Sequence, residues 1–347
     1  MSVMVNELLP LSPVFLHSGF RSGSTWFWKR FRVAENSYAY YEPFNEVLGG
    51  LTLDDIPNYK TTGWASGHPD LIAPYYEEFR PLIRPEGGVI GFRDEFAYGL
   101  YYNKAPHAPQ REYIETLARH ARDLGRVPVF GFCRSFGRVP WLRQHIAGRH
   151  IVTLRNPKDQ WISYCNQLIK YDNSYFQCRA YLIGYIGWKT GVYSNFYQDL
   201  PFPDLLNVPE LERGKKFFSH FESLDMGQRC RIFLRSFALD MLIALPQADL
   251  VVDLDQLSAD PVYRRDMTEQ LRTLTGLMDL SFDDCALPRS EVEDPVWTMA
   301  VEQERAFLDH FFSTLSLPAE ASRVINLVKD MVMRKEESAT FAVSRRA

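Results

Sequence analysis

Residues 19–26 near the N-terminus read GFRSGSTW, a run of small and hydroxyl-bearing residues with one arginine. The apolar stretch at 13–17 precedes this run, so the pattern predicts a buried strand, a tight turn and the start of a helix. Backbone amides in such a turn bind phosphate, and the positive end of the helix dipole adds to the attraction. Gly23 permits close approach of a ligand to the backbone. The hydroxyls that can donate to phosphate oxygens belong to Ser22, Ser24 and Thr25.

The spacing of this run differs from that of an ATP-binding Walker loop. A Walker loop places four residues between its glycines and follows the second glycine with lysine and then serine or threonine. Here three residues separate Gly19 from Gly23, Ser24 follows directly, and the cation of the run is Arg21. An ordinary turn with a helix cap is a further interpretation. The run alone therefore leaves an anion site and a plain turn both open.

A second segment places an arginine and a hydroxyl around another helix start. Arg155 follows an apolar, strand-like stretch, Asn156 suits an N-cap, and Pro157 suits the first helical position. Ser163 then lies about two turns into the predicted helix. A guanidinium and a hydroxyl in this arrangement can hold one phosphate group from two sides. Pairing of Arg155 with a nearby carboxylate, with Ser163 on the helix surface, is an equally good interpretation.

Together these segments resemble the two nucleotide-binding signatures of the sulfotransferase superfamily, whose donor is 3'-phosphoadenosine-5'-phosphosulfate (PAPS). The loop at 21–25 resembles the element that holds the 5'-phosphosulfate, and Arg155 with Ser163 resembles the element that holds the 3'-phosphate. Shorter likenesses lie in the Tyr-Glu-Pro segment at 41–43 and in the strand-to-helix segment at 251–261. The resemblance spans roughly residues 13–48 and 127–277.

The resemblance has two departures. The late Arg-Lys-Gly…Gly-Asp-Trp loop of cytosolic small-molecule sulfotransferases is not found, and the stretch 132–137, nearest to their base-carrying segment, holds no histidine. Arg21 also stands where those enzymes have lysine. The carbohydrate-type and bacterial members are therefore closest in motif, and the departures bear on the acceptor base and the adenine site.

The resemblance implies transfer of a sulfuryl group from PAPS to a hydroxyl of a small-molecule or saccharide acceptor, a carbohydrate or natural product, without a metal. Arg21 can neutralise charge on the leaving group, and the acceptor hydroxyl needs a base. Glu42 is the first candidate for that base, Asp94 the second and His17 the third. Trp26 either stacks on the adenine or packs in the core. The implied donor-binding residues are Arg21, Ser22, Gly23, Ser24, Thr25, Trp26, Arg155 and Ser163.

Two other functions fit the same residues. An ATP-dependent P-loop kinase would bind ATP with Mg²⁺, whereas a catalytically inactive nucleotide-binding homologue would bind the donor without transferring its sulfuryl group.

Strands that alternate with helices predict an α/β fold with a parallel sheet covered by helices on both faces, and the resemblance makes that sheet P-loop-like. We expect a single sulfotransferase domain over residues 1–347, with substrate-side insertions at 49–126 and 172–225. The second insertion is predicted to form an aromatic-rich helical substrate cover. Strands are expected at 13–17, 38–41, 88–92, 127–132, 150–154 and 249–254, and helices at 25–32, 112–124, 140–147, 157–171, 228–245, 261–275, 295–315 and 318–335.

Composition narrows the class of protein. The net charge of -4 argues against a general nucleic-acid binder, which carries a basic surface. The five cysteines are scattered without a CxxC pair, which indicates neither a disulfide framework nor a zinc site. No signal peptide and no run of ~20 apolar residues is recognisable, so the sequence predicts a cytoplasmic protein without a membrane span. The sequence gives no indication of oligomeric state.

Overall fold

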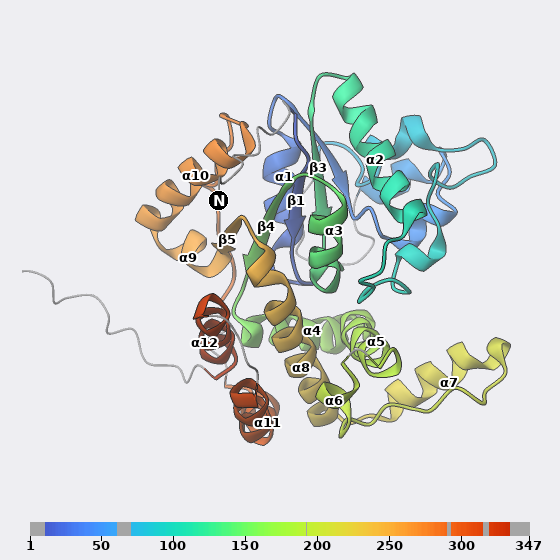
Figure 1. Cartoon of the computed structure of the whole chain (residues 1–347), viewed down its shortest axis with the longest axis vertical. Helices are drawn as coiled ribbons and strands as arrows, with labels where there is room; N and C mark the ends of the chain where they lie inside the picture. The colour runs from blue at the N-terminus through green and yellow to red at the C-terminus, as the bar shows by residue number, and fades with distance from the viewer. Residues whose placement is uncertain (1–10, 61–70, 192, 290–292, 315–318, 334–347) are drawn as a thin grey trace, which may run out of the picture.

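The computed structural model describes residues 11–60, 71–191, 193–289, 293–314 and 319–333 (Figure 1). Five strands form one sheet in the order β2-β3-β1-β4-β5, and each neighbouring pair is parallel. The strands are β1 (Val14–His17), β2 (Ser37–Tyr41), β3 (Val127–Phe132), β4 (Arg149–Leu154) and β5 (Leu250–Asp253). The predicted α/β fold with a parallel sheet is confirmed.

Helices flank this sheet and extend beyond one of its ends (Figure 1). Their bounds agree closely with the sequence pattern where an N-cap residue and proline mark the start, as at 157–171 and 261–275. The helices are α1 (Ser24–Arg32), α2 (Ala108–Asp123), α3 (Val139–His145), α4 (Pro157–Tyr171), α5 (Tyr175–Lys189), α6 (Ser194–Tyr197), α7 (Glu210–Ser223), α8 (Met226–Ala244), α9 (Leu254–Ala259), α10 (Pro261–Thr275), α11 (Pro295–Thr314) and α12 (Ala319–Met333).

Helices cover both faces of the sheet. Successive strand residues point to opposite faces, so neighbouring residues of one strand contact different helices. On one face the indole of Trp28 in α1 lies against Gly131, where a Cβ atom would come within 2.5 Å of the Trp28 ring. On the opposite face Tyr40 stacks on Phe130 with ring centroids 5.5 Å apart, within the ~4.5–7 Å typical of aromatic pairs. The Tyr40 hydroxyl donates to the Leu117 carbonyl in α2. With both faces covered, every residue of β1 and β3 is buried, and all of them except His17 are apolar.

A second hydrophobic core lies beyond the carboxyl ends of the strands. There α8 packs against α4, α5, α11 and α12, which Figure 1 places below the sheet. Ion pairs join α8 to α11 and to the segment after α6: Arg235 of α8 contacts the buried Glu304 of α11, and its Nη2 donates to the half-exposed Asp199 at 2.8 Å. This helical layer forms a wall on the side of the sheet where the motif residues emerge.

The strand predicted at 88–92 is wrong. Gly88 and Gly91 both adopt a φ of 78°, which interrupts an extended chain, and one isolated bridge joins Ile83 to Val89. The helix predicted from residue 112 instead begins at Ala108, where the His107 ring caps it by accepting from the Gln110 amide at 3.2 Å. The ends predicted for the last helix, at 318 and 335, lie outside the described residues. Among the described helices, none combines the length and apolar character that a membrane span needs.

Candidate functional site

Four charged side chains, three of which the sequence singled out, follow the carboxyl ends of neighbouring strands. Arg21 comes after β1, Glu42 after β2, Arg134 after β3 and Arg155 after β4. Parallel strands end at the same edge of a sheet, and ligands of such sheets bind beyond that edge. The fold therefore gathers four charged side chains that lie far apart in the sequence.

The turn between β1 and α1 is held in an unusual backbone conformation. Arg21 has a φ of 59° and Gly23 a φ of 92°, both in the left-handed region. The Ser22 hydroxyl donates to the Gly19 carbonyl at 2.7 Å and so braces the turn from within. No side chain caps α1 at Gly23, and the first amides of a helix have no intrahelical partner. The local geometry suits an anion at the helix start.

Gly23 is also the point where a distant segment crosses the turn. A Cβ atom at this position would come within 2.9 Å of the Leu287 side chain. The Leu287 amide donates to Ser258 Oγ at 2.9 Å, which fixes the crossing segment. The left-handed φ therefore favours glycine here, and the end of the Leu287 side chain would have to shift to admit a Cβ atom.

Arg21, Ser163 and Arg155 come together as one cluster. Arg21 Nε donates to Ser163 Oγ at 2.9 Å, and Arg155 Nη1 donates to the Arg21 carbonyl at 2.7 Å. The Arg21 guanidinium also lies over the Phe176 ring, 5.2 Å from its centroid. The two sequence segments thus meet side by side, as their expected positions at the sheet edge require.

Arg155 is buried, with 6% of its surface exposed, and its contacts are mainly to backbone oxygens. Besides the Arg21 carbonyl, its Nη2 donates to the Pro288 carbonyl at 2.6 Å, while its buried Nε has no hydrogen-bond partner. Burial lowers the pKa of Arg155, an effect that the nearby Asp255 and Asp159 oppose. A buried guanidinium with an unused donor is suited to accept an anionic ligand.

The predicted cap of α4 positions this cluster. Asn156 Oδ1 accepts from the Lys158 amide at 2.9 Å, and the Asn156 amide donates to Asp255 Oδ2 at 2.6 Å. Asp255 follows β5, so the last strand of the sheet supports the end of β4. Asp255 belongs to the strand-to-helix segment 251–261, whose sequence resembles that of sulfotransferases.

A cavity of about 340 Å³ opens beside Arg21. Its volume falls in the range of ~300–1,000 Å³ typical of small-molecule sites. It is bounded by residues at the ends of β1, β2 and β3 and at the start of α1, by residues within 45–59 and 75–76, and by α5. The lining residues are Phe20, Arg21, Ser24, Thr25, Tyr41, Glu42, Asn45, Glu46, Val47, Asn58, Tyr59, Tyr75, Tyr76, Cys133, Arg134, Tyr175 and Phe176.

Glu42 forms part of the cavity wall and is itself 2% exposed. It adopts a φ of 51°, accepts from the Cys133 amide through Oε1, and accepts from Arg134 Nε through Oε2 at 2.7 Å. Burial raises the pKa of Glu42, although Arg134 and the hydrogen bonds from Cys133 and Arg134 oppose this. A carboxylate with a raised pKa is a stronger base than an exposed one.

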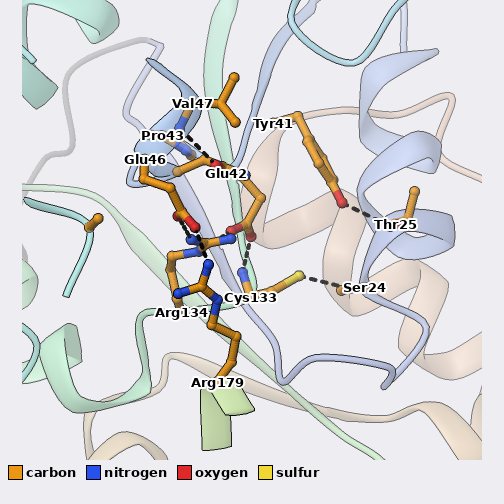
Figure 2. A network of polar contacts seen from close by, with 12 residues as sticks. Ser24, Thr25, Tyr41, Glu42, Pro43, Glu46, Val47, Cys133, Arg134 and Arg179 are labelled. Carbon is orange, nitrogen blue, oxygen red and sulfur yellow. Dashed lines mark hydrogen bonds and ion pairs between the residues drawn. The ribbon is translucent and has the colours of Figure 1, made fainter. Parts of the chain in front are cut away.

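The ion network continues from Glu42 to α5, as Figure 2 shows. Arg134 also contacts Glu46 Oε2, and Arg179 Nη2 donates to Glu46 Oε1 at 2.6 Å. Burial would raise the pKa of Glu46, but Arg134 and Arg179 outweigh it and the pKa is lowered. The cavity thus contains two carboxylates that are both held by arginine.

Two hydrogen bonds join the helix start to the second and third strand ends (Figure 2). Cys133 Sγ lies 2.9 Å from Ser24 Oγ, and Thr25 Oγ1 lies 3.1 Å from the Tyr41 hydroxyl. Burial raises the pKa of the Cys133 thiol well above its usual range, so the thiol stays protonated. Ser24 and Thr25 therefore line the cavity with their hydroxyls already oriented.

Other predicted residues lie elsewhere. Asp94 is exposed, lies near Gly49, and is not part of the cavity wall. His17 is fully buried, with its ring nitrogens 2.7 Å from Ser135 Oγ and 3.0 Å from His150 Nδ1. Burial lowers the pKa of His17 well below its usual value, so this ring remains neutral within the sheet.

Trp26 packs against the ring of Phe282, with centroids 6.0 Å apart, and the Arg30 guanidinium lies 5.5 Å from its ring. It is partly buried and lies at the edge of the sheet core. These contacts agree with the packing interpretation of Trp26 and leave part of the ring accessible.

Sequence reasoning did not select Glu46, Arg179 or Cys133 for the site. Glu46 lies four residues after Glu42 in a short 3-10 helix, and Arg179 is carried by the aromatic-rich α5. The sequence marks Glu46 and Arg179 only as charged residues within apolar or aromatic segments. Their role in the site is visible only after folding brings those segments together.

No protein-family model, no curated protein and no solved structure matches the chain. The functional conclusion therefore depends on the geometry and chemistry of the site.

Proposed function

We propose that the protein is a sulfotransferase that moves a sulfuryl group from PAPS to an acceptor hydroxyl. The observation that carries the proposal is the cluster of Arg21, Ser163 and Arg155 beside a cavity that contains Glu42. Such an arrangement provides cations for an anionic donor on one side of the reaction centre and a base on the other.

The donor side would use the turn and both arginines. The amides at the start of α1 and the hydroxyls of Ser24 and Thr25 would hold the 5'-phosphate end, in the manner of a P-loop. Arg155 and Ser163 would hold the 3'-phosphate, which would replace the Pro288 carbonyl as a partner of Arg155. The unused Nε of Arg155 fits this role, since a phosphate would satisfy a buried donor.

The chemical step would be a direct displacement at sulfur. The acceptor oxygen forms a new S–O bond, the bond between sulfur and the bridging oxygen of the 5'-phosphate breaks, and Glu42 takes the acceptor proton. The products are a sulfate ester and adenosine 3',5'-bisphosphate. Arg21 neutralises charge on the departing phosphate, and it stays protonated throughout.

The helical segment after residue 172 would serve as the substrate cover. Tyr175 and Phe176 at the start of α5 line the cavity, and Phe176 lies beside Arg21. Closure of the cavity from this side would exclude water from the sulfur atom and so limit hydrolysis of the donor.

The test is incubation of the protein with ³⁵S-labelled PAPS and a mixed library of hydroxyl acceptors, followed by mass spectrometry. The proposal predicts a donor-dependent sulfated product in the wild type and its loss in Arg21→Ala. If ATP with Mg²⁺ stabilises the protein against thermal unfolding and adenosine 3',5'-bisphosphate does not, a kinase would be favoured instead. Bisphosphate binding without transfer to any acceptor would indicate an inactive homologue.

A further inference from the structure

The cavity is lined by aromatic rings in two groups. Tyr41, Tyr59, Tyr75 and Tyr76 form the first, with Tyr41 and Tyr75 centroids 4.6 Å apart and Tyr59 edge-on to Tyr76 at 4.9 Å. The second group consists of Phe20, Tyr175 and Phe176. Rings of this kind bind other rings through stacked and edge-to-face contacts.

The charges around the cavity cancel. Arg134 is shared by Glu42 and Glu46, and Arg179 pairs with Glu46, so two cations face two carboxylates. Arg21, the remaining charged residue in the cavity wall, belongs to the donor in the proposed function. An acceptor with its own carboxylate would bring a further buried charge to a neutral site, at a cost in binding free energy.

Polar groups of the cavity wall are largely committed to one another. Asn45 Oδ1 accepts from the Val47 amide at 3.1 Å, and its Nδ2 donates to the Tyr76 hydroxyl at 3.0 Å. The Tyr41 hydroxyl is likewise engaged with Thr25. A sugar would bury several hydroxyls here, and each hydroxyl left without a hydrogen-bond partner would weaken its binding.

We propose that the acceptor is a small, uncharged phenol or aromatic alcohol, and that Glu46 is the residue that sets this charge preference. The inference rests on the proposed sulfuryl transfer and adds the class of acceptor to it. The rings provide the apolar contacts, the single reacting hydroxyl faces Glu42, and the balanced arginines and carboxylates disfavour a charged substituent.

Glu46 is the natural point at which to change this balance. Its side chain is 37% exposed, unlike the buried Glu42, and it lies between Arg134 and Arg179. Glu46→Gln keeps the size of the side chain but leaves the network with one excess positive charge. Arg179→Gln has the opposite effect and leaves one excess negative charge.

The experiment compares kcat/KM for four acceptors at a fixed PAPS concentration: 4-ethylphenol, 4-hydroxyphenylacetate, tyramine and methyl glucoside. In the wild type, 4-ethylphenol should exceed 4-hydroxyphenylacetate and methyl glucoside by ~10-fold or more. Glu46→Gln should reduce the preference for 4-ethylphenol over 4-hydroxyphenylacetate by ~10-fold, and Arg179→Gln should raise tyramine relative to 4-ethylphenol. Glu212→Gln removes an exposed carboxylate on α7 and should retain the wild-type ratios.

Several results would overturn the inference. A wild-type preference for 4-hydroxyphenylacetate or methyl glucoside contradicts the acceptor class, and ratios unchanged in both network variants remove Glu46 from its role. Calorimetry with adenosine 3',5'-bisphosphate separates this inference from the proposed function. Bisphosphate binding with sulfation of methyl glucoside but of no phenol contradicts the acceptor class alone, whereas failure of both binding and sulfation contradicts the donor assignment as well.

Discussion

Arg134 and Arg155 are both buried arginines at the carboxyl edge of the same sheet, yet their surroundings differ. Arg134 follows β3 and is held by the carboxylates of Glu42 and Glu46. Arg155 follows β4, donates to two backbone carbonyls and retains an unpaired Nε. The guanidinium of Arg134 is committed to carboxylates and shapes the cavity. Arg155 hydrogen-bonds to backbone carbonyls and keeps a donor available for an anion, although Asp255 and Asp159 lie near enough to offset part of its charge.

Arg138 shows that the lack of a carboxylate partner does not by itself make a buried arginine an anion-binding residue. It is fully buried, donates from Nη2 to the Ala97 carbonyl at 2.7 Å, and has two unpaired nitrogens. Its guanidinium lies 4.6 Å from the Phe44 ring centroid and 5.7 Å from that of Tyr101, and burial lowers its pKa to about 9. Enclosure by rings closes Arg138 to a ligand, whereas Arg155 lies beside the turn and the crossing segment at Pro288.

The largest effect on stability is expected at Arg134. Arg134→Leu leaves Glu42 buried without its cation, which costs ~3–5 kcal/mol in the free energy of unfolding. Chemical denaturation measures this loss. The double variant Arg134→Leu with Glu42→Leu should recover part of it, because no buried charge is then left unpaired; a single variant as stable as the wild type would show that the pair contributes little.

Asp240 is a buried acidic residue that, unlike Glu42, has no arginine among its described hydrogen-bond partners. It accepts from the Tyr101 hydroxyl at 2.8 Å, and burial raises its pKa from 3.8 to about 7. The folded state therefore holds a proton that the unfolded state has lost between these pH values, so this contribution to stability falls as the pH rises through that window.

A variant without this carboxyl isolates its contribution to the pH dependence of stability. Asp240→Asn should flatten the decline in melting temperature between about pH 4 and 7, by an amount corresponding to at most ~4 kcal/mol. An identical pH profile in the two proteins would show that Asp240 is not the titrating group. The variant keeps an oxygen that can accept from Tyr101.

In the cavity, Glu42→Gln should lower kcat by ~100-fold, the contribution expected of a general base. Steady-state rates with a fixed acceptor measure this effect. Glutamine keeps the shape of the side chain, so bisphosphate affinity should change little. A wild-type rate in this variant would move the proton acceptor to another residue and leave Glu42 as a partner of Arg134 only.

The smallest expected effect concerns the segment that crosses the turn. The Leu287 amide donates to Ser258, and the Pro288 carbonyl holds Arg155. A 3'-phosphate on Arg155 would displace this carbonyl, so hydrogen exchange at the Leu287 amide should change on addition of adenosine 3',5'-bisphosphate. Exchange that is the same with and without the bisphosphate would place its phosphate elsewhere.

Much of the fold could be predicted because its signals are local. Apolar runs gave the strands, and Asn156 with Pro157 gave the start of α4. The strand at 88–92 failed because glycine conformation, rather than apolar character, decided it. The left-handed φ of Arg21 likewise has no sequence signal, since non-glycine residues rarely adopt it.

The site was predictable only where its residues act through local geometry. Arg21 and Arg155 follow strand ends, Ser163 lies about two turns into α4, and the structure brings the three together. Asp94 was selected for its residue type and lies away from the cavity wall. Glu46 and Arg179 were not found because their pairing spans 133 positions and exists only in the folded chain.

Binding of adenosine 3',5'-bisphosphate without added metal tests the central claim most directly. Isothermal titration calorimetry of the wild type should show a single site, and Arg155→Ala should weaken it by at least ~10-fold with the thermal melt still cooperative. Arg155→Lys, which keeps the charge but loses the planar fork, should fall between the two. An affinity that is the same in all three proteins, or no binding to the wild type, would contradict the account.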